Sequence, residues 1–213
     1  MQGLIYEDNH LFIIDKKAGM PTQDNGKALE NATDLAKSWI KKSCDKKGAV
    51  FLEPIHRLDK PVSGLVLFAR TSKALSRLQK MMRERKIRKW YYALVEKAPA
   101  EQGILEDFLI HDEFCAKVVP STHPLGKKAI LSYQVLKRTP RGILLEIELQ
   151  TGRYHQIRAQ LSFAGSPIIG DRKYGSHQNW KEDAIALHHG KLELIHPVTQ
   201  SPLLFTANPP FLQ

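Results

Sequence analysis

The segment HRLDKPVSG, residues 56–64, gathers several ionisable side chains in one short stretch. Its carboxylate, Asp59, could take part in nucleophilic or proton-transfer chemistry. Lys60-Pro61 favours a turn directly after it, and the apolar run LVLFA follows at 65–69. A charged loop at the end of a buried strand is a common place for a functional site. Asp59 is therefore the leading candidate for chemistry.

Motifs that bind cofactors or metals are missing from the sequence. No two glycines stand two positions apart, as a dinucleotide fingerprint requires, and no phosphate-binding loop occurs. No His-x-x-x-His or Cys-x-x-Cys occurs, and His188-His189 on a strand would point to opposite faces. Ser63 lacks the Gly-x-Ser-x-Gly elbow of a hydrolase. We therefore expect chemistry by ordinary side chains, with no cofactor and no metal.

The composition is that of a folded, basic protein. Its 213 residues, 42% hydrophobic and 25% charged, suit one domain or one domain in two lobes. The net charge of +10 predicts a polyanionic partner, nucleic acid first and an anionic membrane second, the alternative being a basic protein without such a partner. Cys44 and Cys115 predict free thiols in a reducing compartment. With no signal peptide and no apolar run near the roughly 18 residues of a membrane span, we expect a cytoplasmic location.

Hydrophobic patterning predicts the strands that must position Asp59. The near-continuous apolar strand 63–70 directly follows its loop, and FLEPIH before the loop reads as a short extended segment. A tight Asp8-Asn9 turn joins the first strand pair. Strands are expected at 4–7, 10–15, 63–70, 87–97, 103–110, 128–138 and 142–150, with two more within 186–205. This order favours an α+β fold with a mixed, mostly antiparallel sheet over a regular βαβ array.

Three segments have helical spacing. The first is 33–43, the second begins with Ser72 as its cap and runs to about Lys86, and the third is 153–165. The residues expected to face inward are Leu35, Trp39, Ile40, Leu75, Leu78, Met82, Tyr154, Ile157 and Leu161. On the third helix, Arg158 shares the opposite face with His155 and Ser162.

Residues 56–70, HRLDKPVSGLVLFAR, resemble the signature of the RluA family of RNA pseudouridine synthases, His-Arg-Leu-Asp-x-x-Thr-Ser-Gly-Leu. Three further stretches resemble that family's motifs in the same order: IIDKKAGMP (13–21), KWYYALV (89–95) and TGRYHQIRAQLSFAGSPIIGDRKYG (151–175). The C-terminal LIHPVTQSPLLFTANPP also fits. Val62 replaces the usual Thr and Lys17 the usual Pro. We interpret both departures as variation in loop support or substrate contact.

The resemblance implies the pseudouridine synthase fold, with the sheet in two lobes and flanking helices. It implies a single catalytic domain over residues 1–213, without the accessory N-terminal RNA-binding domain of many relatives. It also implies that uridine in ribosomal or transfer RNA is isomerised to pseudouridine on a flipped-out base. Asp59 would be the essential carboxylate, as nucleophile or base, with Arg158 as its charge partner. Tyr91 would lie against the target base.

The same resemblance and the basic charge predict how RNA is held. We expect His56 and His155 to order loops by hydrogen bonds. We expect RNA as the partner, no membrane, no obligate protein partner and a monomer. The residues expected to contact RNA are Arg57, Lys60, Lys73, Arg77, Lys80, Lys89, Arg153, His155, Arg172 and Lys173.

Alternatives remain for the residues and for the function. Tyr91 could be a core tyrosine, Arg158 a surface arginine, and the basic run 73–89 a solvated helix face. The chain could be a catalytically inactive RNA-binding or RNA-folding protein of the same fold. A glycosidic hydrolase would need a second carboxylate near Asp59, for which Glu53 is the nearest candidate in sequence. A membrane-surface protein would need an amphipathic helix with an aromatic apolar face, which the sequence lacks.

Overall fold

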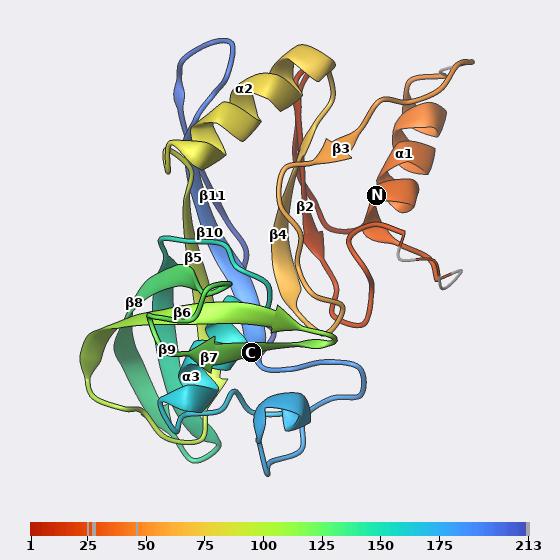
Figure 1. Ribbon diagram of the computed structural model, residues 1–213. Helices are drawn as coiled ribbons and strands as arrows, with labels where there is room; N and C mark the ends of the chain where they lie inside the picture. Colours follow the sequence, from red (N-terminus) through yellow and green to blue (C-terminus); the bar gives the residue numbers. More distant parts are fainter. Residues whose placement is uncertain (25, 27–28, 46, 212–213) are drawn as a thin grey trace. The chain divides into compact units, whose positions relative to one another are not determined.

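The computed structural model describes residues 1–24, 26, 29–45 and 47–211, which form two compact units (Figure 1). Unit 1 contains the described residues of Met1–Ile87 and Gly190–Asn208. Unit 2 contains Arg88–His189 and residues 209–211. Antiparallel strand pairs with helices beside them make up both units, so the predicted α+β class with a mostly antiparallel sheet is confirmed.

In unit 1, strands β1 (Leu4–Glu7) and β2 (Leu11–Lys16) form the predicted N-terminal hairpin. The turn is held by Asp8, whose Oδ1 accepts hydrogen bonds of 2.7 Å from the backbone N–H groups of His10 and Leu11. Strand β2 also pairs antiparallel with β4 (Ser63–Ala69), in a register that sets Lys16 opposite Gly64. The last residue of β2 therefore lies beside the start of β4, where the Asp59 loop ends.

Strand β4 is buried along its whole length, as its apolar sequence predicts. The short β3 (Glu53–Pro54) pairs with the far end of β4, and the tail supplies β10 (Leu187–Ile195) and β11 (Pro202–Thr206), an antiparallel pair. Side chains of β2, β4, α2, β10 and β11 share one apolar core, which includes Leu11, Ile13, Leu65, Leu67, Leu78, Leu192 and Phe205. The core fixes the strand from which the Asp59 loop projects.

Two helices belong to unit 1, α1 (Ala32–Ser43) and α2 (Ser72–Arg83). The prediction that Ser72 caps α2 is wrong. Thr71 has the extended backbone of an N-cap, and its Oγ1 accepts a 3.1 Å hydrogen bond from the N–H of Ala74. The helix also ends before Lys86, since Arg85 adopts a left-handed φ of +57°.

Unit 2 is built on strands paired in the order β5-β9-β8-β6-β7. The strands are β5 (Arg88–Val95), β6 (Gln102–Asp112), β7 (Cys115–Val119), β8 (Lys127–Thr139) and β9 (Gly142–Leu149). Strand β7, which has five residues and follows β6 after a tight turn, was not predicted from the sequence. Glu113 makes that turn with a left-handed φ of +45°.

Helix α3 (Gln156–Phe163) packs against β7, β6 and the short 3₁₀ helix η1 (Arg172–Tyr174) (Figure 1). It is shorter than the predicted 153–165, because His155 adopts a left-handed φ of +49° and starts the helix at Gln156. Tyr154 therefore lies outside the helix and is 41% exposed, so its prediction as an inward-facing residue is wrong. All helical residues from Gln156 to Leu161 are buried, including Arg158.

Candidate active site

The loop that carries Asp59 is tied to the segment after β2. Leu58 exchanges two hydrogen bonds with Thr22: the Leu58 N–H donates to Thr22 Oγ1 (3.0 Å), and that hydroxyl donates to Leu58 O (2.9 Å). The Gly19 N–H donates to Lys60 O at 2.8 Å. The Val62 N–H donates to Asp59 O at 3.0 Å and closes the turn through Lys60-Pro61. Asp59 is thus half-buried on a loop that is fixed on both of its sides.

A buried lysine lies beneath this loop. Lys16 is 1% exposed, and its Nζ donates to Met20 O (2.7 Å), Lys17 O (2.9 Å) and, at 3.5 Å, Lys60 O. Burial lowers the pKa of Lys16 to about 7, while the negative charges of Asp59 and Asp15 act in the opposite direction. Lys16 is therefore a buried titratable group that interacts electrostatically with the candidate carboxylate. The sequence analysis did not single it out, although it lies in the motif at 13–21.

Two other residues of the loop support it. The Leu67 N–H donates to His56 Nε2 at 3.3 Å, which is the loop-ordering role expected of His56. Val62 is buried in the place where the family signature has Thr, so this position is packed in apolar surroundings. Of the two cations that flank Asp59, Arg57 is exposed and Lys60 is half-buried.

In unit 2, Tyr91 lies on β5 and is buried. Its ring stacks on His189, with centroids 4.5 Å apart and an interplanar angle of 18°. Lys89 shares this face of β5 because strand side chains alternate, and burial lowers its pKa to about 8. A Cβ atom added at Gly152 would lie 3.7 Å from Lys89 Nζ, so the ammonium lies against the loop before α3. Lys89 was predicted as an RNA contact, and in the structure its side chain is buried.

Arg158 forms a buried ion pair with Asp171. Its Nε donates to Asp171 Oδ2 at 2.7 Å and its Nη2 to Oδ1 at 2.9 Å, the bidentate geometry of strong arginine–carboxylate pairs. The guanidinium carbon lies 4.9 Å from the centroid of the Tyr174 ring. Asp171 was not predicted as a site residue, although it belongs with Arg158 to the motif at 151–175. Asp59 belongs to unit 1, and its pairing with Arg158 stays a prediction.

Hydrogen bonds fix the loop that leads into α3. Thr151 Oγ1 accepts from the Ile130 N–H and donates to Gln156 Oε1, both at 2.8 Å. His155 Nδ1 lies 2.8 Å from the hydroxyl of Tyr174, which also accepts from the Ala116 N–H at 2.7 Å. Burial is the main cause that raises the pKa of Tyr174 to about 12. His155 thus has the loop-ordering hydrogen bond that was expected of it.

Most of the basic residues predicted to hold RNA are exposed. Three of these have part of their guanidinium engaged: Arg77 Nη1 donates to Pro197 O at 2.8 Å, Arg153 Nε to Lys128 O at 2.9 Å, and Arg172 Nη2 to Asn179 Oδ1. His155 is half-buried. The exposed members are Arg57, Lys73, Arg77, Lys80, Arg153, Arg172 and Lys173.

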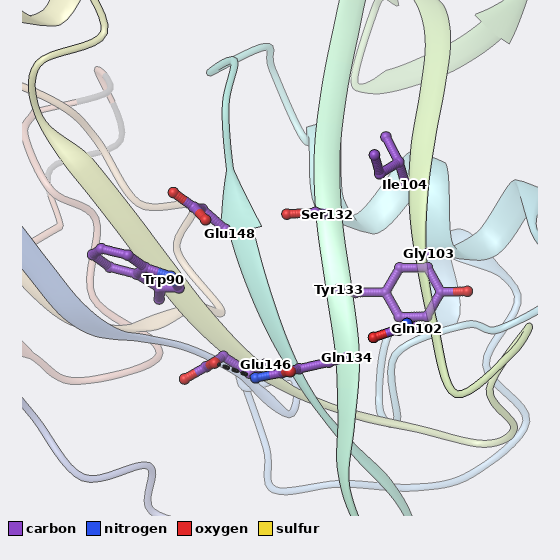
Figure 2. A pocket seen from close by; sticks show the side chains of 9 residues that line it. All are labelled: Trp90, Gln102, Gly103, Ile104, Ser132, Tyr133, Gln134, Glu146 and Glu148. Atoms are coloured by element: carbon purple, nitrogen blue, oxygen red, sulfur yellow. Dashed lines mark hydrogen bonds between the residues drawn. The ribbon is translucent and has the colours of Figure 1, made fainter.

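A cavity of about 540 Å³ lies on unit 2, and Figure 2 shows the side chains around it. Trp90 lines it and Tyr91 does not, because successive side chains of a strand point to opposite faces. Its carboxylates are already bonded: Glu146 accepts from Gln134 Nε2 (2.8 Å), and Glu148 from Arg88 Nε (2.9 Å). We interpret this cavity as a polar groove on the face of β5 opposite to Tyr91.

The described ranges contain neither a cluster of metal-ligating side chains nor a helix suited to a membrane. In residues 1–24, 26, 29–45 and 47–211, no three His, Cys, Asp or Glu side chains are gathered so that they could hold a metal ion. None of the helices in these ranges has the length and apolar character needed to cross a membrane.

Comparison with known proteins identifies similar chains. The model of the family described as RNA pseudouridylate synthase matches residues 10–163. The chain is 32% identical to the dual-specificity RNA pseudouridine synthase RluA of Haemophilus influenzae, over 98% of this chain and 93% of that protein. It is 28% identical to the ribosomal large subunit pseudouridine synthase C of Vibrio cholerae, over 94% of this chain. The chain spans 63% of the length of that Vibrio protein.

A solved structure shows the same fold. The human RNA pseudouridylate synthase domain containing 4 superposes with a TM-score of 0.82 and 24% sequence identity. The match covers 99% of this chain and 90% of the human chain. The arrangement of strands and helices described above is therefore that of a pseudouridine synthase fold.

Proposed function

The chain belongs to the RNA pseudouridylate synthase family, and on that premise we propose that it isomerises uridine in RNA to pseudouridine. In this reaction the base is cut from its sugar, turned and rejoined through carbon-5, so no atoms are gained or lost. The substrate is ribosomal RNA, transfer RNA or both, in line with the names of the Vibrio cholerae and Haemophilus influenzae relatives.

The observation that carries the proposal is that the loop bearing Asp59 is held in a fixed position. Its loop is held by Thr22 and Gly19 and lies over the buried ammonium of Lys16. A fixed, half-buried carboxylate that interacts electrostatically with a buried lysine suits a group that acts on a bound nucleotide, as nucleophile or as base. A solvated surface loop would not need this number of anchoring bonds.

Tyr91 and Arg158 complete the proposed catalytic set. Tyr91 contacts the target base, and the His189 ring stacked on it fixes its plane. Arg158 acts as the charge partner of Asp59. A guanidinium has five N–H donors, so the two bonds to Asp171 leave capacity for a second acceptor.

The exposed lysine and arginine side chains bind the phosphates of the RNA. Lys73, Arg77 and Lys80 are spaced on α2 so that they share one helix face, and all three are exposed. Contacts of this kind with phosphates can offset the few kcal/mol needed to extrude a base. Arg57, Lys60, Arg153, His155, Arg172 and Lys173 are the further proposed contacts. Lys89 is proposed as a contact that only an extruded nucleotide reaches.

The test is pseudouridine formation on unmodified ribosomal and transfer RNA of the same organism, mapped by sequencing. We expect new sites with the wild-type chain and none with Asp59→Asn, which keeps the shape of the side chain and removes its charge. Asp45→Asn is the matched control. Asp45 is exposed with a φ of +44°, a conformation that Asn adopts readily, so this variant should act like the wild type.

The affinity of each variant for RNA separates the alternatives. We expect Asp59→Asn to bind RNA nearly as tightly as the wild type. Strong loss of binding would mean that Asp59 supports the fold or the RNA-binding surface. Binding by the wild type without any new pseudouridine would favour the catalytically inactive RNA-binding protein.

A further inference from the structure

Unit 2 carries a group of side chains that the proposed catalytic set does not use. We call His111, Phe114, Tyr154, His155 and Lys173 the aromatic–basic cluster. Tyr154 lies between two imidazole rings: its centroid is 3.8 Å from that of His155 at an interplanar angle of 18°, and 4.2 Å from that of His111 at 48°. These residues come from β6, the β6–β7 turn, the loop before α3, and η1. The cluster therefore joins segments that are distant in sequence.

Phe114 carries a largely exposed ring of this cluster. It lies in the β6–β7 turn and is 72% exposed. Its backbone is nevertheless fixed, because Phe114 O accepts from Lys173 Nζ at 3.2 Å and from the Tyr154 hydroxyl at 3.5 Å. A single exposed apolar side chain needs no explanation. An exposed ring on a backbone that is held by two donors 40 and 59 residues away in the chain suits a preorganised contact.

The charge around Phe114 favours an anionic ligand. Lys173 Nζ lies 6.0 Å from the centroid of the Phe114 ring, and Arg172 next to it is exposed. Asp112 in the same turn forms an ion pair with Lys117, which neutralises its charge. Glu113 remains as an exposed carboxylate at this turn and opposes an anion. The surface thus offers an aromatic face with an ammonium group beside it.

We propose that the aromatic–basic cluster binds an unpaired nucleotide of the RNA substrate. The base stacks on the Phe114 ring, and Lys173 binds the adjacent phosphate. Unpaired bases expose the ring faces that such platforms require, whereas a paired base within a duplex is covered by its neighbours. The proposal deepens the proposed function and rests on it, since it places a nucleotide of the same RNA outside the catalytic residues.

The experiment measures binding of two fluorescent RNAs, a stem-loop with uridines in its loop and a fully paired duplex of equal length. Phe114→Ala should weaken stem-loop binding by about 5- to 160-fold, the range for one lost base–aromatic stack, and leave duplex binding unchanged. Phe114→Trp should keep the wild-type affinity. Phe163→Ala is the matched control, because Phe163 on α3 is 68% exposed and not part of the cluster, so its affinity should equal the wild-type value.

A cross-linking measurement checks the contact itself. A stem-loop with 5-iodouridine in its loop should cross-link on irradiation to the peptide that contains residues 111–117, and Phe114→Ala should remove that product. Wild-type affinity of Phe114→Ala for the stem-loop would overturn the proposal, and so would equal losses with stem-loop and duplex. These outcomes are distinct from failure of the proposed function, which is decided by pseudouridine formation with Asp59→Asn and not by binding.

Discussion

At the scale of single residues, Lys16 shows how the Asp59 loop depends on a buried charge. Its ammonium donates to three backbone oxygens on the two segments that meet beneath the loop. Truncation of the lysine would remove this donor from Lys17 O and Met20 O, whereas Lys60 O would keep its bond from the Gly19 N–H. The lost hydrogen bonds would weaken the support of the loop. Burial of the ammonium has its own cost, which appears as the lowered pKa. The hydrogen bonds of the ammonium stabilise the loop, whereas burial of its charge destabilises the fold. The cost of the buried charge depends on pH, because it disappears when the lysine loses its proton.

The lowered pKa of Lys16 predicts that the free energy of unfolding depends on pH. Its pKa is about 7 in the folded protein and near 10.5 when unfolded, so between these values the unfolded chain binds the additional proton. The free energy of unfolding should therefore rise from pH 7 towards pH 9, by up to about 1.4 kcal/mol per pH unit from this group. The stabilising contribution is full above the unfolded pKa and is lost as the pH falls through 7. Lys89, with a pKa of about 8, acts in the same direction.

Urea unfolding of Lys16→Met and the wild type at pH 7, 8 and 9 tests this prediction. The variant should show a smaller increase of unfolding free energy with pH than the wild type. Lys41→Met removes an exposed lysine of α1 and should keep the wild-type increase. Equal increases in Lys16→Met and the wild type would contradict the prediction.

At the scale of elements, the start of α2 depends on one hydroxyl. Thr71 caps the helix by its bond to the Ala74 N–H, whereas Ser72 is an exposed first helical residue. Thr71→Ala should lower the free energy of unfolding by about 1 kcal/mol. Ser72→Ala should change it by less than about 0.5 kcal/mol, as is usual for exposed positions. Denaturant unfolding of both variants measures the two decreases in the free energy of unfolding. A larger decrease for Ser72→Ala than for Thr71→Ala would show that the cap lies one residue later.

The elements also show how far the sequence could predict the structure. The buried strand β4 was predictable because seven consecutive apolar or small residues can belong only to a core element, and its loop followed from the turn at Lys60-Pro61. The cap of α2 was not, because Thr71 and Ser72 carry equivalent hydroxyls and only backbone conformation separates them. The start of α3 was missed because a left-handed His155 is rare and leaves no signal in hydrophobic periodicity.

Only the part of the candidate site that lies within one segment of the sequence could be predicted. Asp59 was recognised because its motif is local, with all its residues on one loop. The bond between Arg158 and Asp171 joins a helix to the turn before η1, and the support of the loop by Lys16 joins it to β2. Periodicity reports which face of an element is apolar and carries no information on ion pairs between elements.

At the scale of the whole molecule, the net charge of +10 predicts that RNA affinity falls with salt. Each phosphate contact releases counterions, so the logarithm of the binding constant should fall linearly with the logarithm of salt concentration. The slope should change by about 0.7 to 0.9 for each contact that is removed. Net charge alone gives no location for these contacts, whereas the exposed face of α2 does.

The double variant Lys73→Gln/Lys80→Gln tests this location, since both side chains are exposed on that face of α2. Its salt slope with the RNA stem-loop should be shallower than the wild-type slope by about 1.4 to 1.8. Lys41→Gln/Lys42→Gln removes the same charge from exposed positions at the end of α1 and should leave the slope unchanged. An equal change in both double variants would mean that RNA responds to the total charge of the protein and not to contacts at α2. Binding titrations at four or more salt concentrations, with the RNA held constant, decide between these results.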